Sequence, residues 1–64
     1  MENSTLIQTG LDILRREACG SQDRSWKRHN EIMRRAEDHV RACGADWFEI
    51  EPEFSQEIAE LLGL

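Results

Sequence analysis

Apolar residues recur at intervals of three or four along the first third of the chain, the spacing that places side chains on one face of a helix. These residues are Ile7, Leu11, Leu14 and Ala18. A helix is therefore expected over residues 5–18, because Thr5 and Gln8 have the spacing of a capping box and Gly20 is suited to end it. Leu6 and Ile13 widen its apolar face, whereas Gly10 weakens its interior.

A second and longer apolar pattern follows the turn "GSQD". Its members are Trp26, His29, Met33, Ala36, Val40 and Cys43. Intervals of three and four alternate, which predicts a packed helix over residues 23–43 with Ser21 or Asp23 as N-cap and Gly44 at its end. Trp26 is expected on the buried seam. A break of the helix near Asn30, itself a competent N-cap, is the alternative.

The pattern changes after Gly44, where Phe48 and Ile50 alternate with acidic residues. No second alternating run exists to pair with this segment, so we expect an extended or single-turn connector. Pro52 suits the first position of a last helix, because its missing N–H costs nothing there. The apolar face of that helix comprises Phe54, Ile58, Leu61 and Leu62. Trp47 and Phe48 are expected to close the open end of the domain.

These elements predict an all-α fold in which residues 1–64 form a single, small three-helix domain. A chain of 64 residues buries only about 60% of the surface that it exposes when unfolded, so its core must be small. Apolar residues make up 39% and charged residues 33%, a composition that favours a folded helical chain over a disordered one. No apolar run approaches the roughly 20 residues that span a bilayer. Residues 1–10 also lack the pattern of a signal peptide, so we expect a cytoplasmic protein.

The two cysteines, Cys19 and Cys43, lie near the ends of consecutive helices that should run antiparallel. Helical rise then separates them by roughly 20 Å, far more than a disulfide allows, so we expect two reduced and mostly buried thiols. His39 shares a helix face with Cys43, and His29 lies toward the end that holds Cys19. Four ligand candidates divided between two ends do not make a zinc site, and the sequence predicts no metal and no cofactor.

No arrangement of side chains typical of catalysis is present: there is no glycine-rich turn around a serine, no phosphate-binding loop and no paired nucleophile and base. We therefore expect a protein that is not an enzyme, without catalytic residues.

The segment "RSWKRHNEIMRR" has cations interleaved with Trp26, a combination that binds phosphates and stacks on bases. Four pairs at i,i+4 spacing argue for local neutralisation of this charge: Lys27 with Glu31, Glu31 with Arg35, Arg34 with Asp38, and Glu37 with Arg41. A buried Trp26 and the net charge of −5 also argue against direct binding of nucleic acid.

The net charge of the chain lies entirely in its last part. Residues 1–45 hold all eight basic and seven acidic residues, a net charge of +1, whereas residues 46–64 hold six acidic residues and no basic one, a net charge of −6. The six are Asp46, Glu49, Glu51, Glu53, Glu57 and Glu60, which we select as candidate partner-binding residues. Glu53, Glu57 and Glu60 share a helix face beside the apolar stripe.

Like charges at this spacing destabilise an isolated helix by roughly 0.2–0.5 kcal/mol per pair, so stability alone does not explain them. Two explanations remain open. The acids pack beside the basic second helix and neutralise it, or they are presented to a basic partner. In the second case their spacing is close to the roughly 3.4 Å that separates phosphates along one DNA strand, so an acidic helix face can occupy a nucleic-acid groove.

A small, acidic, helical chain without catalytic signature that ends in "DWFEIEPEFSQEIAELLGL" resembles the phage-encoded anti-CRISPR proteins, in particular those that act on type I complexes such as type I-C. The resemblance covers size, charge and helix content. It implies a DNA mimic in the cytoplasm of an infected bacterial host that binds the Cascade complex and inhibits it without enzymatic activity. The abundance of arginine departs from the simplest DNA mimic.

The sequence thus predicts an inhibitor that uses its acidic surface to occupy a positively charged nucleic-acid-binding site on a partner protein or complex. We expect no membrane association and a monomer or weak dimer. A small regulatory or antitoxin-like protein-interaction module is one alternative. A small nucleic-acid binder that uses the basic second helix is another.

Overall fold

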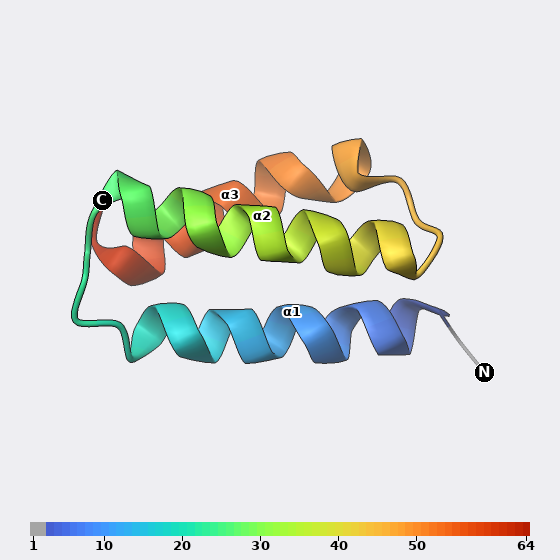
Figure 1. Ribbon diagram of the computed structural model, residues 1–64, viewed down its shortest axis with the longest axis horizontal. Helices are drawn as coiled ribbons and strands as arrows, with labels where there is room; N and C mark the ends of the chain where they lie inside the picture. Colours follow the sequence, from blue (N-terminus) through green and yellow to red (C-terminus); the bar gives the residue numbers. More distant parts are fainter. Residues whose placement is uncertain (1–2) are drawn as a thin grey trace.

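The chain folds into three helices that run antiparallel to one another in sequence order (Figure 1). In the computed structural model, which describes residues 3–64, α1 spans Asn3–Cys19, α2 spans Trp26–Ala42 and α3 spans Trp47–Leu62. The C-terminal end of α3 returns to the loop between α1 and α2. The expected all-α, three-helix fold is confirmed, and residues 3–64 contain no strand.

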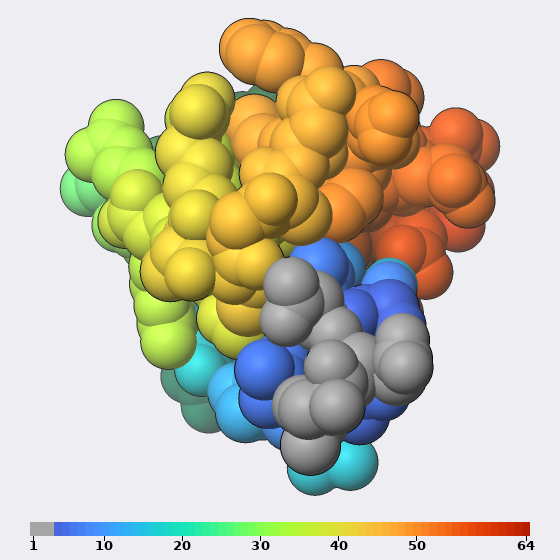
Figure 2. Space-filling view, turned by 90° about the vertical axis from the view of Figure 1, so that its right-hand side faces the viewer, coloured from blue at the N-terminus to red at the C-terminus, as the bar shows by residue number. Residues whose placement is uncertain are grey.

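Each helix contributes apolar side chains to one shared core. Viewed along the bundle, the helices occupy three corners and their side chains fill the space between them (Figure 2). The bulkiest side chains with almost no exposed surface come from all three helices, and they are Phe54, Leu11, Ile32, Ile58, Leu62 and Val40. Burial of each such side chain stabilises the fold by about 1.5–3 kcal/mol, so the core depends on all three helices together.

The start of α2 lies later than the sequence pattern indicates. Ser25 is the N-cap, and its hydroxyl accepts a hydrogen bond from the backbone N–H of Arg28 at 3.2 Å. Ser21 and Asp23 lie in the preceding loop, where the Ser21 hydroxyl donates to the Asp23 carbonyl. The helix continues through Asn30 without a break, because the buried positions on either side of it belong to one continuous face.

The expected connector before the last helix is wrong, because residues 47–51 form the first turns of α3. Asp46 is the N-cap, and its side chain accepts a hydrogen bond from the Phe48 N–H at 3.0 Å. Pro52 is therefore the sixth residue of α3 and removes one helical hydrogen bond. Burial of Trp47 and the cap at Asp46 offset that loss.

The two aromatic residues at this end of the bundle have opposite environments. Trp47 is only 6% exposed and belongs to the core, as expected, whereas Phe48 is 74% exposed and closes nothing. The Arg41 guanidinium lies over the Phe48 ring, 5.8 Å from its centroid. Trp26, expected in the core, is 57% exposed, because the first residue of α2 lies at the rim of the bundle rather than on the seam.

Two histidines of α2 connect it to the neighbouring helices. His39 Nε2 donates to the Leu6 carbonyl of α1 at 3.0 Å, and His29 Nε2 donates to the Ser55 carbonyl of α3 at 3.0 Å. A carbonyl only accepts, so Nε2 is the donor in each of these contacts. His29 is the one buried polar side chain among the described residues whose burial is given.

The structure explains why glycine occupies position 10 in the interior of α1, which the sequence pattern does not reveal. A Cβ atom at this position would overlap the imidazole of His39, with contacts to three of its ring atoms. Glycine therefore allows the His39 ring to pack against α1 and reach the Leu6 carbonyl.

The start of α1 also differs from the sequence prediction. Thr5 is the third residue of α1 rather than its N-cap.

Both cysteines are free, in agreement with the expectation of reduced thiols. They terminate α1 and α2, whose C-terminal ends lie at opposite ends of the bundle. Cys19 is exposed rather than buried, and Cys43 is partly buried. None of the helices within residues 3–64 has the length and apolar composition needed to span a bilayer.

Gly10→Ala should destabilise the protein by about 1–3 kcal/mol, because the new methyl group displaces the His39 ring. In most helix interiors the change from glycine to alanine instead raises the free energy of unfolding by roughly 0.5–1 kcal/mol. Thermal unfolding followed by circular dichroism measures the change. In a His39→Ala background the same substitution should become neutral or stabilising, and an equal loss in both backgrounds would contradict the proposed contact.

The two tryptophans provide a matched comparison of core and surface. Trp47→Ala should cost about 3–5 kcal/mol, whereas Trp26→Ala should cost about 1 kcal/mol or less. Urea unfolding of the two variants and the parent measures both values. A larger loss for Trp26→Ala than for Trp47→Ala would contradict their placement in the fold.

Candidate functional site

Four glutamates of α3 form one exposed row, which we call the acidic stripe: Glu49, Glu53, Glu57 and Glu60. Their spacing of four, four and three residues keeps them within about 80° of the helix circumference at roughly 100° per residue. The row includes Glu49, which sequence analysis assigned to the connector. Glu49 and Glu60 are eleven residues apart, so the stripe is about 16 Å long.

The other two candidate residues lie apart from the stripe. Asp46 precedes α3 and serves as its N-cap, so its carboxylate already accepts a backbone hydrogen bond. Glu51 is half-buried and falls on the side of α3 that carries Trp47 and Ile58. The structure thus brings together four of the six predicted residues.

Only one member of the stripe forms an ion pair within residues 3–64. Arg15 of α1 reaches Glu57 through Nη2 at 3.0 Å and contacts Asp12 through Nη1 at 2.6 Å. Burial lowers the pKa of the Arg15 guanidinium, but the hydrogen bonds and charges of Glu57 and Asp12 outweigh this effect, so its pKa is raised overall. Arg15 therefore stays charged and neutralises one of the four carboxylates of the stripe.

A shallow groove of about 140 Å³ runs between α1 and α3 beside the stripe. Its lining residues are Gln8, Leu11, Arg15, Glu49, Ile50, Glu53, Phe54 and Glu57. The Arg15 guanidinium lies 5.4 Å from the centroid of the Phe54 ring, and its buried Nε has no hydrogen-bond partner among the described residues. The stripe thus borders a groove with an apolar floor and a single cation.

Two arginines of α2 pair with one acid of α1. Both carboxylate oxygens of Glu17 in α1 accept hydrogen bonds from the Arg35 guanidinium. Glu17 Oε1 also lies 3.6 Å from Arg28 Nη2. No ion pair joins an acid of residues 46–64 to α2 within the described part of the chain. The explanation in which these acids neutralise the second helix is therefore not supported by the geometry.

Of the four ion pairs expected along α2, only one forms. Glu37 accepts from Arg41 at 2.8 Å, as its i,i+4 spacing predicts. Glu31 pairs with Arg28 at 3.3 Å, at i,i+3 spacing, instead of Lys27 or Arg35. Lys27 and Arg34 form no ion pair with any residue of the described chain.

The histidines and cysteines do not form a metal centre. Between residues 3 and 64 no group of three or more potential ligand side chains is positioned to hold a metal ion. His39 Nε2 lies 3.9 Å from the Cys43 Sγ, but this nitrogen already donates to the Leu6 carbonyl. His29 is likewise bonded within the bundle, so both rings have structural partners.

Arg15 is the functional-site residue that sequence analysis missed. Its contact with Glu57 spans 42 residues, and no local spacing reveals such a pair. The start of α3 did have a local signal, because Asp46 and Glu49 have the spacing of a capping box. Recognition of that box would have placed Glu49 on the helix and extended the stripe by one turn.

Comparison of this chain with protein-family models, with curated proteins and with solved structures found no match.

Neutral replacement should distinguish the paired and unpaired members of the stripe. Glu57→Gln should lower the free energy of unfolding by up to about 1 kcal/mol, because Arg15 loses one of its two carboxylates. Glu53→Gln should leave it unchanged or raise it by about 0.2–0.5 kcal/mol, because like-charge repulsion is relieved. Urea unfolding at low salt measures both. A loss for Glu53→Gln as large as for Glu57→Gln would show that Glu53 has a stabilising partner.

Proposed function

We propose that this chain is a non-enzymatic inhibitor that places the acidic stripe of α3 into a positively charged nucleic-acid-binding site of a partner. The observation that carries the proposal is the charge balance around the stripe. Four carboxylates lie along about 16 Å of helix, and Arg15 is the one cation of residues 3–64 that is paired with them. Such a face attracts a basic surface strongly.

The cost of the stripe to the folded chain supports this proposal. Glu49, Glu53 and Glu57 repel one another at i,i+4 spacing, which destabilises the helix by roughly 0.2–0.5 kcal/mol per pair. Glu60 lies in the last turn, where a negative charge opposes the helix dipole. Opposite charges on a partner would remove both penalties on binding, so they contribute to affinity as well as to the rate of association.

The stripe carries its negative charges along a line, as one strand of a nucleic acid does, but spaces them more widely. One carboxylate occurs about every 5.5 Å, compared with one phosphate per roughly 3.4 Å of axis along a DNA strand. The stripe therefore offers a lower charge density than DNA over the same length. The groove beside it adds an apolar floor, formed by residues such as Leu11 and Phe54, that a phosphate backbone lacks.

The resemblance to anti-CRISPR proteins gives the partner a concrete identity to test. We propose a type I effector complex of the Cascade class, with type I-C first, in the cytoplasm of a phage-infected bacterium. Such a complex has a basic channel for DNA, which the stripe would occupy in competition with the target. The inhibitor would then act by occupancy alone, without chemistry of its own.

Two charge reversals on the stripe, Glu49→Lys with Glu53→Lys, should weaken inhibition of a type I-C effector complex by about ten-fold or more. Asp46 and Glu57 are left unchanged, because one caps α3 and the other pairs with Arg15. A gel-shift assay of labelled target DNA with the purified complex measures how much inhibitor is needed. Inhibition should also weaken as salt rises, because exposed charges are screened.

The matched control reverses two exposed acids elsewhere, Asp23→Lys with Asp38→Lys. Each reversal adds two positive charges, so both double variants change the net charge from −5 to −1. The control should inhibit within about two-fold of the parent. Equal loss in both double variants, or no effect of the parent on DNA binding, would contradict the proposal.

A further inference from the structure

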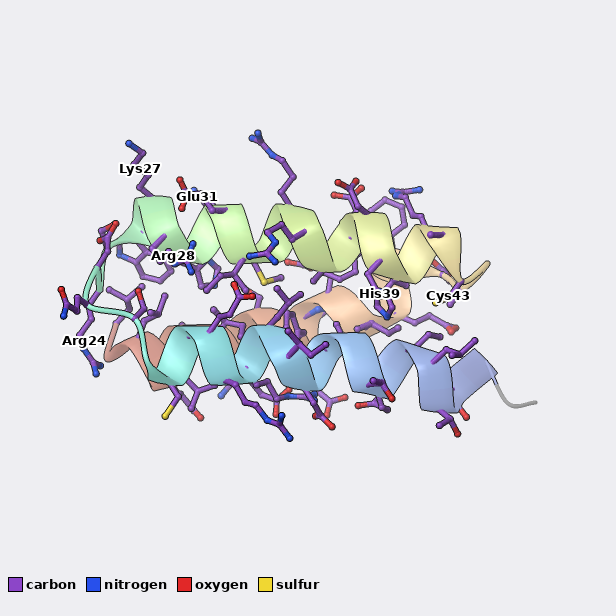
Figure 3. The ribbon with its side chains drawn as sticks, turned by 60° about the horizontal axis from the view of Figure 1, so that its bottom comes forward. Arg24, Lys27, Arg28, Glu31, His39 and Cys43 are labelled. Atoms are coloured by element: carbon purple, nitrogen blue, oxygen red, sulfur yellow. The ribbon has the colours of Figure 1, made fainter. Side chains whose placement is uncertain are left out.

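The outward face of α2 carries an exposed aromatic ring beside cations that no carboxylate of residues 3–64 neutralises. Trp26 begins the helix and is more than half exposed. Lys27 and Arg34, one and eight residues further along, form no ion pair with any described residue. Together with Asn30 and Glu31, these two cations border an open surface hollow of about 400 Å³. Figure 3 shows Lys27 directed away from the bundle, in contrast to Arg28, which is directed toward α1.

The structure removes two of the three arguments that the sequence offered against nucleic-acid binding at this helix. Trp26 is not a core residue, and the expected pairs of Lys27 with Glu31 and of Arg34 with Asp38 do not form. Glu31 pairs instead with Arg28. The positive charge of Lys27 and Arg34 is therefore available to a ligand.

The indole is anchored rather than loosely placed. Its ring lies 5.1 Å from the His29 ring, in an edge-to-face arrangement with an interplanar angle of 70°. His29 is itself buried and donates to the Ser55 carbonyl of α3. An edge-to-face contact covers at most one side of the indole, so the remaining surface is available for stacking.

We propose that this face of α2 binds single-stranded nucleic acid, with a base stacked on Trp26 and neighbouring phosphates bound by Lys27 and Arg34. Stacking on an exposed aromatic ring beside cations is the general means by which proteins bind single strands without sequence preference. The amide of Asn30 lies between the two cations along the helix and matches the edge of a base. Duplex DNA keeps its bases stacked inside the helix, so the indole selects the single strand.

The third argument, the net charge of −5, concerns a different face of the molecule. The acidic residues that make the chain negative lie on α3, and Figure 2 shows α2 and α3 at different corners of the bundle. At physiological salt the Debye length is about 8 Å, so charges on another helix are largely screened. On α2 itself, Glu31 and Glu37 are paired with arginines, which leaves Asp38 as the uncompensated acid near Arg34.

This inference goes beyond the proposed function and does not depend on it, because it uses residues of α2 and not the acidic stripe.

Fluorescence anisotropy of a labelled 20-nucleotide oligothymidine, titrated with the full chain at about 0.15 M salt, tests this inference. The parent should bind, and affinity should fall as salt rises. Trp26→Ala should weaken binding about ten-fold, and Lys27→Gln and Arg34→Gln should each weaken it several-fold. Far-ultraviolet circular dichroism and a thermal melt establish that each variant is folded.

Matched controls separate a local site from general charge effects. Arg16→Gln removes one exposed arginine of α1 that forms no ion pair within residues 3–64, and Phe48→Ala removes an exposed aromatic ring at the start of α3. Both should bind within two-fold of the parent. Absence of parental binding at millimolar protein, or a loss for Arg16→Gln equal to that for Lys27→Gln, would overturn the inference.

A labelled polyglutamate peptide of similar length tests the alternative ligand, an acidic protein segment. It supplies negative charge without bases, so it should bind more weakly than oligothymidine and should not respond to Trp26→Ala. Polyglutamate binding as tight as that of oligothymidine would overturn the inference and identify the face as one for acidic protein segments.

Discussion

The charge distribution of this protein depends on one carboxylate, Glu17 of α1, which is shared by Arg28 and Arg35 of α2. Glu17 pairs with both arginines where the two helices meet, and Arg28 also pairs with Glu31 of α2. Within the described residues, the acids of α3 form no ion pair with α2. This arrangement explains how a chain with eight basic residues still presents an acidic helix face.

The packing of the helices gives that face a fixed position. His29 and His39 bond α2 to the backbone of α3 and α1, respectively, and Gly10 leaves the space that the second of these contacts requires. Small domains bury little apolar surface, so such directional contacts between helices matter for a single arrangement. The acidic stripe and the exposed face of α2 therefore face different, fixed directions.

The three helices were predictable from apolar spacing because burial and helical periodicity coincide over most of the chain. Predictions of burial from this spacing failed where burial depended on how far along its helix a residue lies, rather than on which face of the helix it occupies. Trp26 continues the seam in angle but lies beyond the core at the first residue of α2. In the same way, Pro52 suggested a helix start, while the cap at Asp46 and the burial of Trp47 determined the actual one.

The candidate site was predictable in composition but not in arrangement. Local spacing identified Glu53, Glu57 and Glu60 as one face, because that face belongs to a single helix. The cation that neutralises Glu57 comes from Arg15, and the partner of Arg35 comes from Glu17; both pairs require the tertiary structure. Long-range pairs of this kind leave no periodic signal in the sequence.

The central claim is that the acidic stripe is the surface that a basic partner contacts. Nuclear magnetic resonance mapping with a deca-arginine peptide as the basic probe tests it most directly, because each backbone amide reports separately. The account predicts that chemical-shift changes concentrate on residues 49–60 of α3 and on the neighbouring part of α1 around Arg15. Changes concentrated on Glu31 and Asp38 of α2, or spread evenly over all acidic residues, would contradict it.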